Sequence, residues 1–225
     1  MTFSLAGRCA RTGMFGAVVT SSSPAVAARC ISARSGVGVA CTQNVTDPTL
    51  SAKLLDRLAQ GADAQRAMDF MVATAAYAEY RQLTVVGATG SGASHSGART
   101  LGTHTVATGV DAVAAGNLLS SDKVPEAMVE AFEAEPGAEL AERLLAGLRA
   151  GEEAGGEEGP VHSCGLLVVS DAEWPLTDLR VDWDEDDPIT RLERAWRVWQ
   201  PQAEDYTLRA RRPDLAPSYG VPGDE

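Results

Sequence analysis

The chain has 225 residues, 44% of them hydrophobic and 22% charged, which is typical of a globular protein of one or at most two domains. Its formal net charge is -12, and this balance argues against binding nucleic acid or anionic lipid through a basic surface. Arg8 and Arg11 interrupt the apolar start that a signal peptide needs, and no run of about 18 apolar residues follows. We therefore predict a cytoplasmic protein that binds neither nucleic acid nor membrane.

The first quarter of the chain has the alternating pattern of strands. Residues 2–8 and 14–21 alternate in polarity and are joined by a short turn at Arg11–Gly13, which predicts a hairpin. Two further strands are expected at 28–33 and 36–43. Helical spacing then begins after Pro48, and the apolar positions predict one helix that ends at Gly61 and a second that Asp63 caps.

The same order of strands and helices then repeats. Strands are expected at 83–88, 95–99, 104–110 and 112–117, with a turn at Gly90–Gly92 between the first two. Two apolar stripes after Asp122 predict a second pair of helices. Strands at 163–170 and 179–183 and a helix from Ile189 to Trp199 follow, with Asp187 and Pro188 at the start of that helix. Residues 201–225 are rich in proline and predict a loosely ordered tail.

Strands and helices in separate groups do not fit the strict alternation of a doubly wound fold. Two antiparallel sheets packed face to face and covered outside by helix pairs would satisfy the pattern. We therefore predict an α+β fold, a four-layer αββα sandwich over residues 1–200, followed by the tail at 201–225.

Metal and disulfide chemistry is not indicated. The cysteines lack CxxC spacing, so we expect reduced, buried thiols at Cys9, Cys30, Cys41 and Cys164. The three histidines are too widely spaced for a pair of metal ligands on one helix, and no HExxH motif is present. We predict no metal and no cofactor.

Thr2 stands at the head of the first strand, where the free end of a strand can lie in the cleft between two sheets. If Met1 is removed, Thr2 carries both a hydroxyl nucleophile and an α-amine whose pKa of about 8 suits a general base at neutral pH. Threonine is also a good strand former, so an ordinary structural role stays open.

Two further polar residues are candidate substrate contacts on the residues alone. Arg99 could hold a substrate carboxylate through two parallel hydrogen bonds, with a plain surface arginine as the alternative. His104 is expected to face the cleft. Ser94 and His95 are neighbours on a strand and point to opposite faces, so a Gly/Ser hairpin explains them better than a catalytic pair.

Several segments together resemble a bacterial family known as domain-of-unknown-function 1028. They recur in the family's order, from Thr2 to about Trp199: "TFSLAGR", "GVGVACTQ", "TGSGASHSGART", "GNLL", "GLRAGEEAGGEEG" and "LRVDWDEDDPITRLERAW". The family is placed in the N-terminal-nucleophile hydrolase superfamily, which contains proteasome β-subunits and penicillin acylases. The resemblance implies the αββα fold and makes Thr2 the expected nucleophile.

The resemblance also implies roles by position. Members of the superfamily hold the tetrahedral oxyanion with backbone N–H groups and an Asn or Gln side chain, which makes Gln43 and Asn117 the candidates here. Thr20 and Ser21 end the second strand, where relatives bind the substrate backbone, and Thr42 belongs to the same run as Gln43. We expect these three residues to contact substrate.

One departure from proteasome-like relatives concerns the cation that lowers the pKa of their nucleophile. Those relatives use a strand lysine, whereas no lysine precedes Lys53 here. Arg29, expected on the third strand, is the nearest cationic match, but a guanidinium cannot accept a proton as an amine does.

Two hypotheses follow for the function. The first is an amidohydrolase that cleaves a small amide or ureido-type C–N bond with Thr2 as nucleophile. The second is a non-catalytic small-ligand-binding module that keeps the fold. The Trp-bearing last helix, expected to be exposed, and the habit of the superfamily also predict a homo-oligomer.

Overall fold

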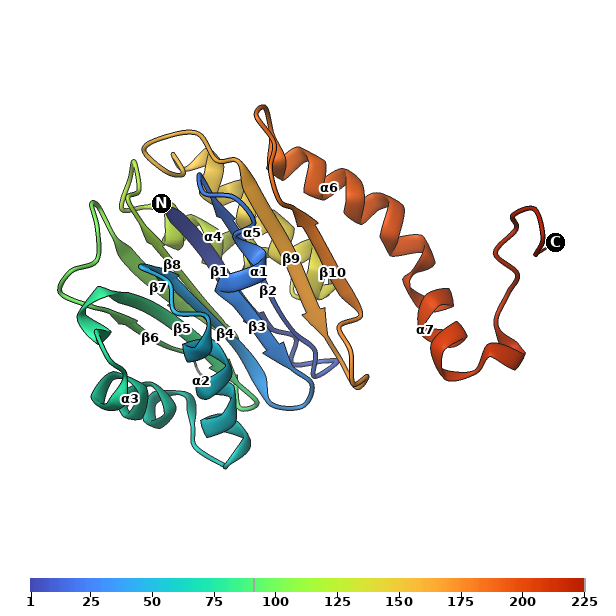
Figure 1. Ribbon diagram of the computed structural model, residues 1–225, viewed down its shortest axis with the longest axis horizontal. Helices are drawn as coiled ribbons and strands as arrows, with labels where there is room; N and C mark the ends of the chain where they lie inside the picture. The colour runs from blue at the N-terminus through green and yellow to red at the C-terminus, as the bar shows by residue number, and fades with distance from the viewer. Residues whose placement is uncertain (91, 225) are drawn as a thin grey trace.

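Two antiparallel sheets form the centre of this computed structural model, which describes residues 1–90 and 92–224 (Figure 1). One sheet has six strands in the order β10-β9-β2-β1-β8-β7 and the other has four in the order β3-β4-β5-β6. The strands are β1 (Thr2–Arg8), β2 (Phe15–Ser21), β3 (Ile31–Arg34), β4 (Gly38–Asn44), β5 (Arg81–Gly87), β6 (Gly92–Ser96), β7 (Thr105–Gly109), β8 (Ala112–Asn117), β9 (Ser163–Val169) and β10 (Thr177–Val181).

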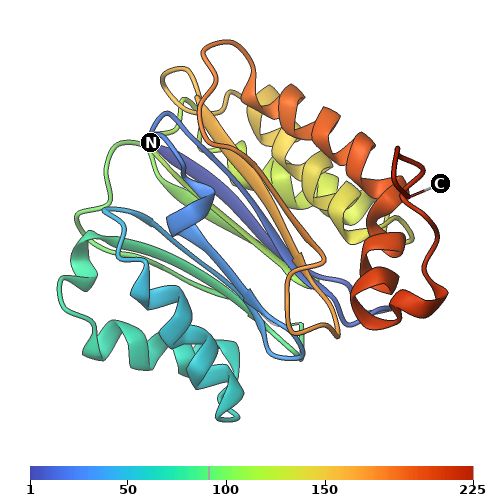
Figure 2. The ribbon, with the colours of Figure 1, turned by 45° about the vertical axis from the view of Figure 1, so that its right-hand side comes forward.

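Helices cover the outer face of each sheet (Figure 2). The helices are α1 (Ala27–Cys30), α2 (Thr49–Ala59), α3 (Ala64–Thr74), α4 (Val124–Ala134), α5 (Leu140–Glu153), α6 (Pro188–Trp199) and α7 (Ala203–Arg211). Helices α2 and α3 lie on the four-stranded sheet, and α4, α5 and α6 lie on the six-stranded sheet. The predicted four-layer αββα sandwich is therefore confirmed.

Three apolar clusters separate the four layers, because successive side chains of a strand point to opposite faces. In β1, Phe3 and Leu5 pack against α4 and α5, whereas Ala6 lies between the two sheets. Burial of each large apolar side chain stabilises the fold by about 1.5–3 kcal/mol. The small residues of the central strands allow close packing: a Cβ at Gly16 would lie 2.7 Å from the carbonyl oxygen of Leu167.

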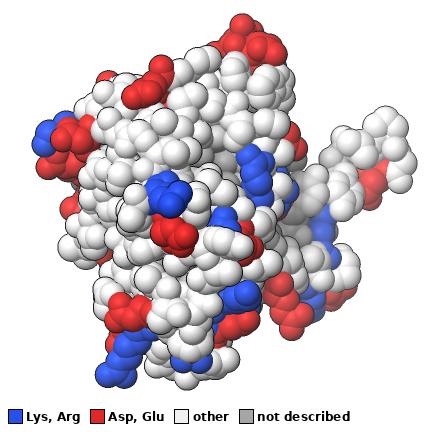
Figure 3. Space-filling view, turned by 60° about the vertical axis from the view of Figure 1, so that its left-hand side comes forward, with Lys and Arg blue, Asp and Glu red and all other residues white. Residues whose placement is uncertain are grey.

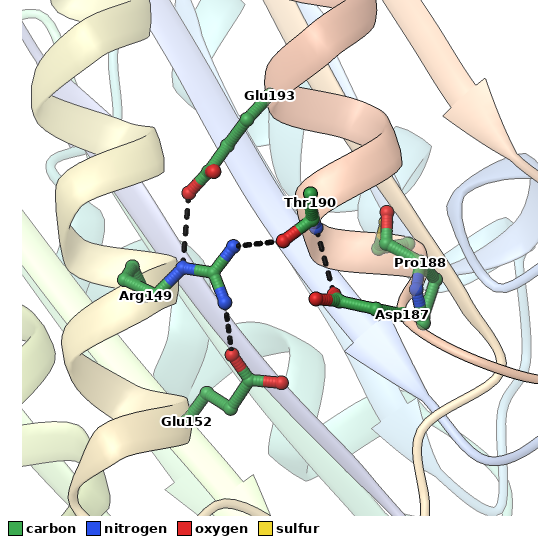
Figure 4. Close-up of polar contacts among 7 residues, drawn as sticks. Arg149, Glu152, Asp187, Pro188, Thr190 and Glu193 are labelled. Carbon is green, nitrogen blue, oxygen red and sulfur yellow. Dashed lines mark hydrogen bonds and ion pairs between the residues drawn. The ribbon is translucent and has the colours of Figure 1, made fainter.

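Arg149 joins α5 to α6 (Figure 4). Its guanidinium donates to Glu193 Oε1 at 3.0 Å, to Glu152 Oε2 at 2.6 Å and to Thr190 Oγ1 at 2.9 Å. Asp187 accepts a hydrogen bond from the backbone N–H of Thr190 and caps α6, as predicted from the sequence.

The strand expected at 28–33 is wrong in its first half, because Ala27–Cys30 form the short helix α1 and β3 starts only at Ile31. Ala25 adopts a positive φ of 51°, which turns the chain before the helix. Arg29 then folds back and donates to the carbonyl oxygens of Pro24 and Ala25. Arg29 therefore lies on a helical turn and not on the third strand.

Smaller differences concern strand boundaries and the tail. The strand expected at 95–99 is β6, which begins at Gly92 and ends at Ser96; Ser91 of the expected turn lies outside the described residues, as does Glu225. The tail contains helix α7, whose Tyr206 stacks on Trp199 at 5.3 Å between ring centroids.

The last helix is also less exposed than expected. Trp196 is only 9% exposed and belongs to the core, and Trp199 is half-buried with its indole N–H bonded to Thr177. The tryptophans of α6 were expected on an open surface because the sequence gives no sign that the segment after Trp199 returns to cover them.

Candidate functional site

Thr2 begins β1, the strand that runs between β2 and β8 in the middle of the larger sheet. It is paired with Asn117 of β8, and the alternation along β1 directs Thr2 and Ser4 toward the smaller sheet. The side chain of Thr2 is almost fully buried, with 5% of the residue exposed. The first residue after Met1 thus lies at one end of the interface between the two sheets.

A chain of hydroxyl groups connects Thr2 to the guanidinium of Arg29. Thr2 Oγ1 lies 3.3 Å from Ser21 Oγ, which lies 2.8 Å from Ser23 Oγ, and Arg29 Nη2 donates to Ser23 Oγ at 2.8 Å. The carbonyl oxygen of Met1 is within hydrogen-bond distance of both the Thr2 and the Ser21 hydroxyl. The hydroxyls of Ser21 and Ser23 therefore connect the Thr2 side chain to the guanidinium of Arg29.

A second buried network is made of side-chain amides. Ser4 Oγ donates to Gln43 Oε1 at 2.7 Å, and Gln43 Nε2 donates to Gln82 Oε1 at 2.9 Å. Asn117 Nδ2 donates to the same Gln82 oxygen at 3.1 Å. Gln82 Oε1 is therefore the shared acceptor that orients Gln43 and Asn117, the two predicted oxyanion residues.

The two predicted oxyanion residues differ in the hydrogen-bonding capacity that they retain. Gln43 Nε2 makes a second bond, to the carbonyl oxygen of Ala115 at 3.1 Å, so both of its N–H groups are used. Asn117 Nδ2 makes one bond to Gln82, and Asn117 Oδ1 has no partner among the described residues. Asn117 is therefore better able than Gln43 to bind an additional group.

Thr20 and Thr42 lie on the outer faces of their strands, away from the interface that holds Thr2. Thr20 Oγ1 donates to the carbonyl oxygen of Ser163 at 2.9 Å, and Thr42 Oγ1 donates to that of Asp47 at 3.3 Å. Strand alternation imposes this, since Ser21 and Gln43 are their immediate neighbours and face inward. Of the residues expected to contact substrate, Ser21 alone contacts Thr2 directly.

Arg99 and His104 lie outside this cluster and are exposed. Arg99 donates to the hydroxyl of Tyr80 at 3.0 Å, and His104 Nδ1 bonds to the carbonyl oxygen of Gly102 at 2.9 Å. Both side chains have local partners that do not belong to the two networks around Thr2. Their predicted substrate contacts stay predictions.

Four residues that the sequence interpretation did not single out take part in the site: Ser4, Ser23, Gln82 and Glu157. Ser4 and Gln82 could have been found from strand periodicity, because Ser4 is two residues from Thr2 and Gln82 is the cross-strand partner of Gln43. Polar side chains at inward positions of buried strands are uncommon and need partners. No local pattern connects Glu157 to Thr2.

Glu157 lies in the loop after α5 and is 6% exposed. Its Oε2 accepts the backbone N–H of Ser22 at 3.2 Å, next to the Ser21 that contacts Thr2. Burial raises the pKa of the Glu157 carboxyl to about 7, and the positive charge of the Met1 amine opposes this rise. A carboxyl group able to gain or lose a proton near neutral pH thus lies beside the start of β1.

The four cysteines are buried and reduced, as expected. Burial raises the pKa of Cys41, which lies between the sheets, to about 11. In the part of the chain that the structure describes, no three His, Cys, Asp or Glu side chains gather as ligands for a metal ion. None of the helices described here is long and apolar enough to cross a membrane.

The charged surface carries both signs. On the face shown in Figure 3, the described Lys and Arg side chains lie among Asp and Glu side chains and form no continuous basic patch. The prediction that nucleic acid does not bind concerns the whole surface and stays a prediction.

Fold and site together define an α+β sandwich protein in which a buried hydroxyl and amide network surrounds the first residue of the central strand. The chain belongs to the family of unknown function DUF1028, whose model matches residues 2–192. This matches the family named from the sequence. The match starts at Thr2, so the site lies within the family domain.

Solved structures were also compared with the chain. The crystal structure of protein SPO2555 from Silicibacter pomeroyi, described with the same family, is similar with a TM-score of 0.82 and 27% identity, over 91% of this chain and 89% of that one. Anbu, an ancestral β-subunit, from Yersinia bercovieri gives a TM-score of 0.41 at 7% identity, over 91% and 96% of the two chains. The Gly-1 mutant of Anbu from Hyphomicrobium sp. strain MC1 gives 0.39 at 11% identity, over the same shares. The Anbu scores are too low to carry an argument. No curated protein matches the chain.

Proposed function

We propose that this chain is an N-terminal-nucleophile amidohydrolase that cleaves a small amide or ureido-type C–N bond, with Thr2 as the nucleophile. The observation that carries the proposal is the contact of Thr2 Oγ1 with Ser21 Oγ, in a buried network that extends to Arg29. The proposal requires that an aminopeptidase remove Met1.

In the proposed reaction, the α-amine of Thr2 takes the proton of its own hydroxyl while Oγ1 attacks the substrate carbonyl carbon. The C–N bond breaks, the proton passes to the leaving nitrogen, and an ester remains on Thr2. Water, activated by the same amine, then hydrolyses the ester and releases the acid. The amine gives back each proton that it takes, so it ends the reaction in the protonation state in which it began.

The α-amine is the base in this scheme because the other nearby nitrogen groups cannot serve. A guanidinium does not accept a proton as an amine does, and the three hydrogen bonds of Arg29 to Ser23, Pro24 and Ala25 fix its orientation. We assign it the role of polarising the Ser23 and Ser21 hydroxyls. This differs from a mechanism in which a lysine beside the nucleophile takes part in proton transfer.

Asn117 supplies the oxyanion contact in this proposal. It is the cross-strand neighbour of Thr2, and its Nδ2 keeps an N–H group that Gln82 does not use. One such donor stabilises the transition state by about 3 kcal/mol. Gln43 supports Asn117 indirectly, through their shared acceptor Gln82.

An intact-mass spectrum before and after exposure to a β-lactone acylating probe tests the proposal. We expect a chain without Met1 and one adduct that maps to Thr2. The Thr2→Ala variant keeps the fold and takes up no probe, while Thr2→Ser retains labelling. A processed wild-type chain that ignores the probe, or a Thr2→Ala variant labelled at the wild-type rate, contradicts the nucleophile.

A second candidate function is a non-catalytic small-ligand-binding module. The saturation of Gln43 favours it, since both N–H groups of that amide already have partners and none is left for an oxyanion. This function tolerates a retained or acetylated Met1, and the same spectrum separates the two. We further propose a small-molecule partner, a cytoplasmic location and a homo-oligomer. Size-exclusion chromatography with light scattering tests the oligomeric state.

A further inference from the structure

Met1 fills the space that lies directly in front of the Thr2 hydroxyl. Its carbonyl oxygen is within hydrogen-bond distance of Thr2 Oγ1 and Ser21 Oγ, and its side chain lies against the loop at Gly159, where an added Cβ would be 3.2 Å from Met1 Cε. Its amine interacts electrostatically with Glu157. The carbonyl and the side chain of this residue thus contact the protein directly, and its ammonium acts on Glu157 by its charge without forming an ion pair with it.

Glu157 is the acidic counterpart of that ammonium. The carboxylate is held in place by one hydrogen bond, from the backbone N–H of Ser22 to Oε2. Its other oxygen, Oε1, is buried and has no hydrogen-bond partner among the described residues. Carboxylates are rarely buried without a partner, because burial without a hydrogen bond or a counter-ion is costly.

Removal of Met1 takes away the positive charge that lowers the pKa of this carboxyl. The α-ammonium of the processed chain belongs to Thr2, one residue further along β1, whereas Glu157 is held at Ser22, next to the Ser21 hydroxyl that bonds the Met1 carbonyl. The vacated space therefore keeps hydroxyl groups at one end, where a carbonyl was bound, and near them the buried carboxyl of Glu157 with one unpartnered oxygen.

We infer that this space takes the acyl part of the substrate, that the acyl part carries an ammonium on the carbon next to the scissile carbonyl, and that Glu157 selects it. The substrate class is then an α-aminoacyl amide, and Met1 in the unprocessed chain imitates its acyl half. This inference rests on the proposed function, because it assigns the substrate of the same nucleophile.

The ammonium group distinguishes α-aminoacyl amides from neutral amides at this site. A substrate ammonium donates to Glu157 Oε1, which is otherwise unpartnered, so binding satisfies a buried acceptor as well as a charge. A neutral or N-acetylated analogue leaves the carboxylate buried and unpaired. Discrimination of this kind is stronger than a difference in apolar contact, since it depends on a buried polar group that only one ligand satisfies.

The probe for the test is L-methioninamide, which has the side chain, ammonium and carbonyl of Met1 itself. Calorimetry on the processed Thr2→Ala chain measures binding without turnover, and ammonia release by the processed wild-type chain measures cleavage. N-acetyl-L-methioninamide is the neutral control ligand. We expect the acetylated ligand to bind at least about 10-fold more weakly, as the loss of one charge-assisted hydrogen bond implies.

Glu157→Gln is the decisive variant, since glutamine can still accept the N–H of Ser22 but carries no charge. We expect it to bind L-methioninamide about 10- to 100-fold more weakly and to bind the acetylated ligand unchanged. Glu158→Gln, at the neighbouring position, is the matched control and should keep the preference. A chain that retains Met1 should bind neither ligand, because Met1 occupies the space. Circular dichroism and thermal unfolding check that each variant is folded.

The outcomes distinguish the inference from the proposed function. If the β-lactone labels Thr2 but the preference for the ammonium is absent, or persists in Glu157→Gln, the inference is overturned and the hydrolase stands. If L-methioninamide binds through Glu157 but Thr2 neither reacts nor releases ammonia, the ligand site stands and the hydrolase is overturned. Failure of both labelling and binding overturns both.

Discussion

Thr2 Oγ1 lies 3.3 Å from Ser21 Oγ, and these two hydroxyls lie on neighbouring strands of one sheet, 19 residues apart in sequence. The hairpin of β1 and β2 brings them together, because the register pairs Phe3 with Thr20 and so extends toward Thr2 and Ser21. The contact is fixed by backbone pairing and not by a mobile loop, and a slip of β1 by one residue would point the Thr2 hydroxyl at the helices.

Loss of the Ser21 hydroxyl should slow acylation of Thr2. Ser21→Ala removes the link between Thr2 and the Ser23–Arg29 pair, so we expect the rate of β-lactone labelling to fall by about 10-fold, as the loss of one hydrogen bond implies. Stopped-time mass spectrometry measures the rate. Thr74→Ala is the matched control, because its hydroxyl bonds the carbonyl oxygen of Phe70 on α3 and belongs to neither network around Thr2. Equal rates in the two variants would contradict a role for the hydroxyl chain.

Gln82→Leu should destabilise the protein although it adds apolar surface to a buried site. The change leaves the amide N–H groups of Gln43 and Asn117 without their shared acceptor and removes the donor to the carbonyl oxygen of Gly116. We expect a loss of about 3 kcal/mol in the free energy of unfolding, as for buried groups left without partners. Urea denaturation measures it. Gln65→Leu on exposed α3 should change stability by less than about 0.5 kcal/mol.

The stability of the chain that retains Met1 should depend on the ionisation of Glu157. Burial raises the pKa of this carboxyl to about 7, above the ordinary value of 4.5 expected for the unfolded chain. Between these values the folded chain binds more protons than the unfolded one, so the contribution of Glu157 to stability falls as the pH rises from about 4.5 to about 7. The loss is about 3 kcal/mol at most, because a tenfold change in proton affinity corresponds to about 1.4 kcal/mol.

The measurement is the difference in unfolding free energy between the unaltered chain and Glu157→Gln, taken at several pH values by urea denaturation. The unaltered chain should lose stability relative to the variant across that interval and run parallel to it above about pH 8. A difference that stays constant from pH 4.5 to pH 7 would show that Glu157 titrates normally.

Arg149→Leu should loosen the attachment of α6 to α5. The side chain bonds three partners on the two helices and is about one quarter exposed, with the Glu193 and Glu152 side chains 21% and 35% exposed. Water can therefore replace part of the interaction, and we expect a loss of about 1–2 kcal/mol in thermal or chemical unfolding. Arg180→Leu removes a more exposed pair with Asp178 and should cost less than about 0.5 kcal/mol. Equal losses would contradict the special role of Arg149.

The order of layers could be predicted because strand and helix periodicities are strong in β1, β4, α2 and α5. Where the sequence interpretation was wrong, contacts with residues outside the predicted element determined the local conformation or the burial. Arg29 stabilises a helical turn in a segment with strand-like composition by bonding to Pro24 and Ala25. Tyr206, which follows the helix, stacks on Trp199 of α6, and no periodicity reveals that contact.

The site was predictable to the extent that strand alternation determines it. Thr2, Ser21, Gln43 and Asn117 were named from the sequence, and they lie in or beside the two buried networks. Thr20 and Thr42 illustrate the limit of reasoning from neighbours, since the residue next to an inward position points outward. Glu157 lies 135 residues from its partner Ser22, and such a contact follows from the tertiary fold alone.

The strand order of the larger sheet has a consequence for biosynthesis. β9 pairs along the whole of β2, with Phe15 opposite Val169 and Ser21 opposite Ser163, although these strands are separated by more than half of the chain. Until the ribosome has produced β9, one edge of β2 has no partner and offers an open template for other strands. Ser163 also bonds to the carbonyl oxygen of Ser23 and the N–H of Val26, so the segment carrying the hydroxyls is fixed only then. Thr2 is therefore synthesised long before β9, the strand that completes the site around it.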